Sequence, residues 1–131
     1  MNDARLELIV SNKQKKKGTM FESAVVGYLN GSGFAARRET LHGSSDHGDV
    51  MATFGALDVT VECKNRKSMS PGWLMGLVDE ADRESENAGT SLGVAVVHRD
   101  GCGEKSMGDS IVVMSLDSFA TAMGGWRNAE R

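Results

Sequence analysis

The chain has 131 residues, of which 40% are hydrophobic and 25% charged, with a net charge of −3 and two cysteines. These values indicate one soluble domain, residues 1–131, and exclude a small disulfide-stapled fold. No apolar run approaches the roughly 18 residues of a membrane span, and the start Met1-Asn2-Asp3 lacks the pattern of a signal peptide. The expected location is the cytoplasm of a bacterial or archaeal cell, or of a cell infected by a phage that encodes the protein.

Residues 1–17 contain a lysine cluster but no clear apolar period, so we expect either a flexible basic arm or an added helical turn. Thr19 and Glu22 match a capping box, and the apolar residues that follow recur at helical spacing, which predicts a helix over 19–30. A strand is expected over 34–40, followed by a polar loop over 42–48.

Gly55 and Ala56 divide residues 49–64 into two short strands. Glycine at the first central position is typical of a two-residue type II′ hairpin, and this turn places Asp49 opposite Glu62. Side chains alternate along a strand, so Glu62 and Lys64 share one face. The other face is apolar and is expected to face the core: Val50, Ala52, Phe54, Leu57, Val59, Val61 and Cys63.

Ser70 and Pro71 predict the start of a second helix that ends near Gly89. The apolar run 92–97 is typical of a strand buried on both faces, expected parallel to the strand that contains Glu62. A glycine-rich loop over 101–109 and a strand over 110–114 follow. A short helix capped by Ser115 is expected to end at Gly124-Gly125, to leave a tail over 125–131 and to turn four residues inward: Leu116, Phe119, Ala120 and Met123.

Asp49, Glu62 and Lys64 are the candidate functional group. Like charges directly opposite on a sheet are destabilising, and a divalent cation would offset their repulsion. Mg²⁺ prefers oxygen ligands and is commonly held by one or two carboxylates, water and substrate phosphate. Lys64 lies roughly 6.6–6.8 Å beyond Glu62 on the same face and could reach a water or a phosphate oxygen. The alternative is that Glu62 and Lys64 are ordinary solvated residues of an exposed sheet face.

Six motifs, in their order and spacing, resemble the PD-(D/E)xK nucleases and, within them, the archaeal-type Holliday junction resolvases. The resemblance covers about residues 17–98. It implies an α/β, restriction-endonuclease-like fold with an αβββαβ core and a central mixed sheet flanked by helices. It also implies Mg²⁺-dependent hydrolysis of DNA phosphodiester bonds, with Mn²⁺ as a substitute, in recombination and repair. The motifs are Lys17-Gly18-Thr19-Met20-Phe21-Glu22, Gly33-Phe34, Arg37-Arg38, Gly43-Ser44-Ser45, Asp49 and Glu62-Cys63-Lys64.

The resemblance also implies roles for single residues. Metal ligands would be Asp49, Glu62, the backbone carbonyl of Cys63 and, through water, Glu22. The alternative for Glu22 is that it acts only in the capping box. Lys64 would orient or activate the water, and one loop serine would contact the scissile phosphate. A transition-metal site in the His42 to His47 loop is a competing interpretation. The implied catalytic set is Glu22, Ser44, Ser45, Asp49, Glu62 and Lys64, and the implied DNA contacts are Lys17, Arg37, Arg38, His47, Arg66 and Lys67.

The implied partner is branched DNA, above all a four-way junction, and no membrane or nucleotide cofactor is expected. Two symmetric cuts are needed to resolve a junction, so a homodimer is expected. Two other functions stay open at this point. One is a related nuclease that acts on flaps, ends or other branched DNA, and the other is a non-catalytic DNA-binding module on the same fold.

Overall fold

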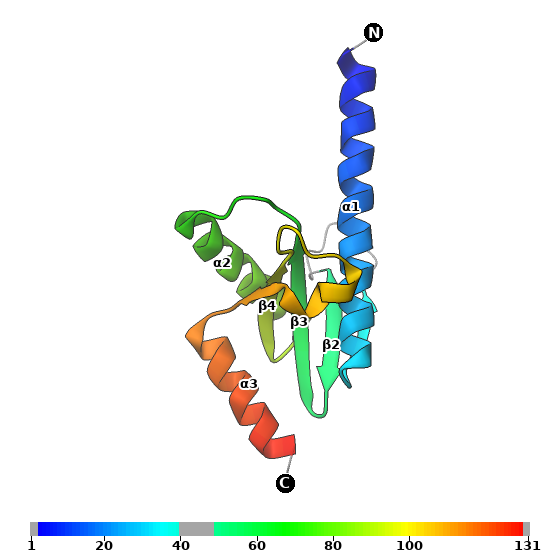
Figure 1. Ribbon diagram of the computed structural model, residues 1–131. Coiled ribbons are helices and arrows are strands. Elements are labelled where there is room, and N and C mark those ends of the chain that lie inside the picture. The colour runs from blue at the N-terminus through cyan, green and yellow to red at the C-terminus, as the bar shows by residue number, and fades with distance from the viewer. Residues whose placement is uncertain (1–2, 40–48, 130–131) are drawn as a thin grey trace.

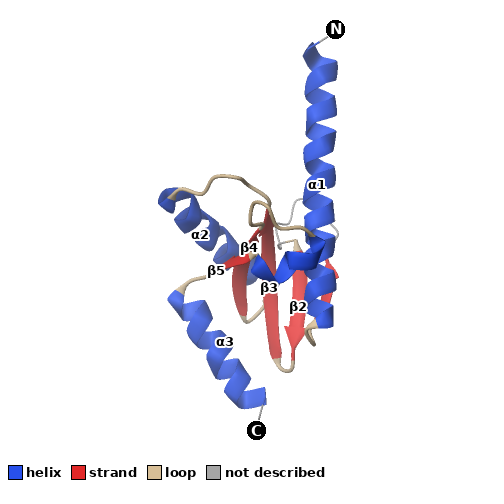
Figure 2. Cartoon of the chain, in the orientation of Figure 1, coloured by secondary structure: helices blue, strands red, loops and turns tan. Residues whose placement is uncertain are grey.

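In the computed structural model a five-stranded sheet lies between helices (Figures 1 and 2). The structure describes the backbone of residues 3–39 and 49–129, and the side chains of residues 13, 16–39 and 49–124. Within the described residues, no helix is both long and apolar enough to cross a membrane. The elements are α1 (Asp3–Gly31), β1 (Ala35–Arg38), β2 (Val50–Phe54), β3 (Leu57–Lys64), α2 (Pro71–Ala88), β4 (Leu92–Val97), the 3₁₀ helix η1 (Glu104–Asp109), β5 (Ile111–Val113) and α3 (Leu116–Ala129).

The strands are ordered β1-β2-β3-β4-β5 across the sheet. β2 is antiparallel to both β1 and β3, β4 runs parallel to β3, and β5 pairs antiparallel with β4 at the edge. The predicted αβββαβ core with a mixed, helix-flanked sheet is therefore confirmed. The predicted parallel pairing of residues 92–97 with the strand of Glu62 is also confirmed.

The hairpin has the predicted register, with Phe54 paired with Leu57 and Val50 paired with Val61. Gly55 has φ 61°, as the first central residue of a type II′ turn requires. Asp49 lies just beyond β2, and its N–H donates to the carbonyl of Val61 at 3.2 Å. Regular pairing thus stops one residue short, and the expected direct pairing of Asp49 with Glu62 is not part of the ladder.

The two faces of the sheet pack against different helices. On the α1 face, Phe21 and Val25 pack with the predicted apolar residues of the hairpin, although Phe54 is 38% exposed. On the α2 face, Leu77 and Ala81 pack against Ala95 and Val97. Because both faces are covered, β3 is buried from Val59 to Glu62, and Glu62 is only 4% exposed. The interpretation of Glu62 as a solvated surface residue is therefore wrong.

The first helix is much longer than predicted. α1 runs without interruption from Asp3 to Gly31, so Thr19 is not an N-cap and Glu22 lies in the helix interior. The N-terminal part of α1 projects beyond the sheet (Figure 1). A helix that faces no core needs no apolar stripe, and Lys, Gln, Glu, Arg and Leu have high helix propensity. The two expectations for residues 1–17 were a flexible arm and an added helical turn. The described part of this segment is helical, but it is far longer than one turn.

The last helix differs from the prediction in length and orientation. α3 continues through Gly124 to Ala129, so neither a helix end at Gly124-Gly125 nor a tail from residue 125 is observed. Ser118 is buried and Ala122 packs against the core instead of the larger apolar residues. Ser115 does cap the helix, because its Oγ accepts from the N–H of Ser118 at 3.0 Å. The residues wrongly expected to point inward are exposed: Leu116, Phe119, Ala120 and Met123.

Candidate active site

Asp49 lies where the hairpin strands end. Its Oδ2 accepts a hydrogen bond from the N–H of Cys63 at 2.9 Å, which fixes the carboxylate beside the last residues of β3. Cys63 points to the α1 face, whereas Glu62 and Lys64 point to the α2 face. Asp49 is close enough to Glu62 to raise the pKa of that carboxyl group. The hairpin therefore brings the two predicted carboxylates together, although they do not form a ladder pair.

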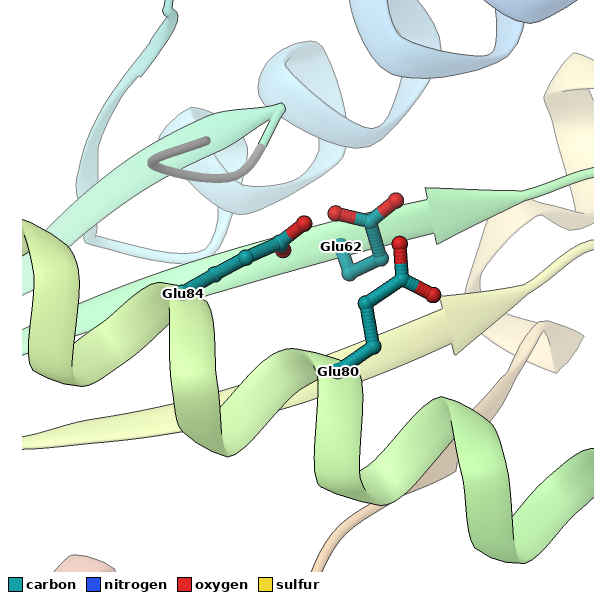
Figure 3. Close-up of side chains that lie close together, drawn as sticks. All are labelled: Glu62, Glu80 and Glu84. Atoms are coloured by element: carbon teal, nitrogen blue, oxygen red, sulfur yellow. The ribbon is translucent and has the colours of Figure 1, made fainter. Parts of the chain in front are cut away.

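Two further carboxyl groups reach Glu62 from α2. Ligand atoms of Glu62, Glu80 and Glu84 all lie within 4.8 Å of one another, and Figure 3 shows the three side chains converging between β3 and α2. Glu84 is 1% exposed and shares a hydrogen bond with Glu62. Carboxylate oxygens are the ligands that hard divalent cations prefer, so these residues fit a cation such as Mg²⁺ or Mn²⁺.

Burial is the main reason that the pKa of Glu62 is raised, to about 7. The negative charges of Asp49 and Glu80 raise it further, while the hydrogen bond with Glu84 and the charge of Lys64 lower it. Near neutral pH the metal-free site therefore holds a proton on Glu62 in a large fraction of molecules. A cation that binds there has to displace that proton.

Lys64 lies between two of these acids. Its Nζ is 3.2 Å from Glu62 Oε1 and 3.7 Å from Glu80 Oε1. Partial burial lowers the pKa of Lys64, but the nearby carboxylates of Glu62, Glu80 and Asp49 outweigh burial, and the net pKa is raised. Lys64 is therefore an ammonium at neutral pH, a donor and a positive charge rather than a base.

Glu22 approaches the site from α1. Its Oε2 lies 3.0 Å from Arg38 Nη2 and accepts a hydrogen bond from Arg38 Nε at 3.1 Å. Burial and then the charge of Asp49 raise the pKa of Glu22, against the opposing effect of Arg38. Glu22 therefore has no capping-box function; it is held by Arg38 and lies close enough to Asp49 for that charge to raise its pKa.

The predicted DNA contacts have different surroundings. Arg37 makes a surface ion pair with Glu39 at 3.6 Å, so only Arg38 of the two arginines joins the site. The guanidinium of Arg66 lies over the ring of Trp73, 4.8 Å from its centroid. Lys17, Arg66 and Lys67 line one cavity next to the site. Ser44, Ser45 and His47, with the competing His42 and Asp46, lie outside the described residues.

Cys63 offers a metal only its backbone oxygen. Burial, followed by the charges of Asp49, Glu22 and Glu62, raises the pKa of its thiol, so the sulfur stays protonated. The side chain packs against the α1-face core. The predicted use of the carbonyl of Cys63 agrees with this arrangement but is not tested by it.

Sequence reasoning missed Glu80 and Glu84. The signal was available in part, because Glu84 is three residues after Ala81 and seven after Leu77, which places it on the buried stripe of α2. An acid on such a stripe, in a helix that packs beside an acidic strand, indicates a polar site.

Residues 13–71 match the family described as archaeal Holliday junction resolvase (hjc). The chain is also similar to a solved structure of Archaeoglobus fulgidus Hjc, a Holliday junction resolvase from an archaeal hyperthermophile, with a TM-score of 0.49 and 23% identity over 66% of this chain and 72% of that chain. No curated protein matches the chain. The matched segment contains Glu22, Asp49, Glu62 and Lys64. Over residues 13–71, less than half of its length, the chain is thus similar to the archaeal Holliday junction resolvase family.

Proposed function

We propose that this protein is a divalent-metal-dependent endonuclease that resolves four-way DNA junctions. The observation that carries the proposal is the convergence of Asp49, Glu62 and Lys64 at the end of β3, beside Glu22 of α1, within the segment that matches the family. An acidic site that holds one ammonium group suits phosphodiester hydrolysis, in which negative charge has to be stabilised on phosphoryl oxygens.

The metal would be held by Asp49, Glu62 and the backbone carbonyl of Cys63, with Glu22 acting through water. Mg²⁺ is the proposed ion and Mn²⁺ its substitute, because the side-chain donors are carboxylate oxygens. When bound, such an ion polarises the scissile phosphate and lowers the pKa of a bound water. The N–H of Cys63 orients Asp49, and Arg38 orients Glu22, so both acids are held before substrate arrives.

Lys64 would hold the attacking water or a phosphate oxygen as a hydrogen-bond donor. Its contacts with Glu62 and Glu80 keep the ammonium charged and hold it beside the proposed metal ligand Glu62. Ser44 or Ser45 would contact the scissile phosphate. The proposed contacts of the DNA backbone are Lys17, Arg37, Arg38, His47, Arg66 and Lys67.

A homodimer would supply the two active sites that two symmetric cuts require. The edge strand β5 and α3 expose apolar side chains that a monomer would leave in water. Val112 is 52% exposed, Leu116 82%, Phe119 50% and Met123 49%. We propose that this surface, named here the α3 face, pairs with its copy around a two-fold axis.

The test compares a labelled four-way junction, a flap and a linear duplex, each with Mg²⁺ and with EDTA. Wild type should cut the junction symmetrically and only with the metal, and Asp49→Asn should cut at least about 100-fold more slowly. Asp58→Asn is the matched control, because it makes the same change on an exposed residue of the same hairpin, whose side chain accepts a hydrogen bond from Thr53. Equal cutting of flaps or linear duplex would indicate a nuclease with another substrate, and junction binding without cleavage would indicate a DNA-binding module.

A further inference from the structure

A cavity of about 360 Å³ opens next to the candidate active site on the α1 face of the sheet. Phe21, which lines it, directly precedes Glu22, and Arg66, at its edge, is two residues beyond Lys64. The cavity and the active site therefore share α1 and the segment that follows β3. A DNA strand held at the active site would pass the mouth of this cavity.

The floor of the cavity is apolar and partly aromatic. The rings of Phe21 and His98 pack edge to face with centroids 5.2 Å apart. The His98 ring is held by a 2.6 Å hydrogen bond between Nε2 and the carbonyl of Cys102. Met107 is buried, whereas Met20 is 59% exposed at the entrance. Such a floor suits a flat apolar group, since bases stack on aromatic and sulfur-containing side chains.

The rim of the cavity is charged in a way that fits a nucleotide. Lys17, Arg66 and Lys67 provide three cations for phosphate oxygens. Asp100 and Glu104, also at the cavity, can accept hydrogen bonds only, as the exocyclic amino groups of bases require. Three of the six residues predicted to contact DNA thus surround one concave site with an apolar floor.

We propose that this cavity receives one nucleobase of the DNA, extruded from the stack beside the scissile phosphate. The inference rests on the proposed function and deepens it, because it assigns a site through which the protein distinguishes a branch point from continuous duplex. Bases at a branch point are less well stacked than bases in a duplex, so extrusion costs less there. In uninterrupted duplex the full cost of unpairing and unstacking disfavours the same contact.

Photocrosslinking tests the location of the base. Four-way junctions carry 5-iodouracil in place of single thymines on either side of the branch point and are irradiated with the full chain in EDTA, so that no strand is cut. We expect one position to crosslink to Met20, Phe21 or His98, as mapped by tandem mass spectrometry. Crosslinks confined to other residues, or none in a complex that forms on a gel, would overturn the inference.

A matched pair of variants tests the energetic role. Met20→Trp fills the entrance of the cavity, and Met75→Trp makes the same change at an exposed methionine of α2, 65% exposed and lining a different pocket. An abasic residue at the crosslinked position should weaken junction binding about 5- to 100-fold for wild type and Met75→Trp. It should have little effect for Met20→Trp, which has already lost the contact. An equal loss in all three proteins would overturn the inference.

Cleavage with Mg²⁺, measured on the same junctions, separates this inference from the proposed function. A chain that binds and crosslinks through the cavity but does not cut would support base binding and refute the nuclease. A chain that cuts junctions without crosslinks in the cavity would refute only the base site. A chain that does not bind junctions would refute both.

Discussion

The proton on Glu62 makes the stability of the metal-free protein depend on pH. The pKa of this carboxyl group is raised by burial from an ordinary 4.5 to about 7 in the folded state. Between these values the folded protein binds more protons than the unfolded chain, so the free energy of unfolding falls as pH rises. A difference of about 2.5 pH units, at about 1.36 kcal/mol each, corresponds to about 3 kcal/mol of stability that is present below pH 4.5 and lost above pH 7.

Glu62→Gln should remove this contribution, because the amide does not ionise. Urea unfolding in EDTA, followed by circular dichroism between pH 4.5 and 8, gives the free energy of unfolding for each protein. We expect wild type to lose about 3 kcal/mol more than Glu62→Gln across this range. Glu86→Gln, an exposed glutamate of α2, should behave like wild type. Identical pH profiles for wild type and Glu62→Gln would refute the assignment of the proton to Glu62.

Metal binding should reverse the loss. A divalent cation that binds Glu62 competes with its proton, so 10 mM Mg²⁺ should raise the melting temperature of wild type more at about pH 7.5 than at about pH 5. Glu62→Gln should lose most of this stabilisation at both pH values. The same Mg²⁺-induced shift in both proteins would mean that the ion binds elsewhere.

Four further predictions concern single positions. Glu22→Gln should keep the Arg38 contact but lower junction cleavage about 10- to 100-fold at limiting Mg²⁺, and unchanged cleavage would contradict a role in metal binding. Glu80→Gln should lower kcat about tenfold. It should also move the alkaline limb of the pH–rate profile to lower pH, because the carboxylate of Glu80 raises the pKa of Lys64. An alkaline limb at the wild-type pH would contradict the contact between Glu80 and Lys64. Gly93→Ala should destabilise the protein by about 1–3 kcal/mol in urea unfolding. Gly76→Ala should be neutral or stabilising, because, apart from its neighbours in α2, no described atom lies within 4 Å of the position that its Cβ would take. Equal effects of the two substitutions would contradict the close packing of α2 on β4. Phe119→Lys should convert a dimer to a monomer in light scattering while Met75→Lys leaves the dimer intact, and a dimer in both would exclude the α3 face as the interface.

Local signals made the hairpin and α2 predictable. A two-residue turn allows only one register of the two strands that it joins. The position of Gly55 was therefore enough to pair Val50 with Val61. Ser70 caps α2 as expected, accepting from the N–H of Trp73 at 3.1 Å. Asp49, Glu62 and Lys64 could be grouped from the sequence for the same reason, since one short turn separates their strands.

The unpredicted features depend on long-range packing or on surfaces without a core partner. The extension of α1 has no apolar pattern because it projects away from the sheet (Figure 1). In α3 two stripes compete, and the smaller residues Ser118 and Ala122 pack inward while Phe119 and Met123 stay exposed. An apolar pattern cannot by itself distinguish a core-facing stripe from a stripe that faces a partner.

The close approach of α2 to the sheet links packing to the chemistry of the site. A Cβ at Gly93 would overlap with the carbonyl oxygen of Ala81 and lie 2.7 Å from its carbonyl carbon, so glycine is what allows α2 to lie this close to β4. Ala81 is flanked in sequence by Glu80 and lies three residues before Glu84, the two acids that reach Glu62. Any change that moves α2 outward therefore moves both carboxyl groups away from Glu62 and Lys64. Gly93 and all of α2 beyond Pro71 lie outside the segment 13–71 that matches the family, yet Glu80 and Glu84 of α2 contribute to the pKa of Glu62, and Glu80 contacts Lys64. We therefore expect Gly93→Ala to change the pH dependence of stability as well as its magnitude, which a purely steric defect would not do.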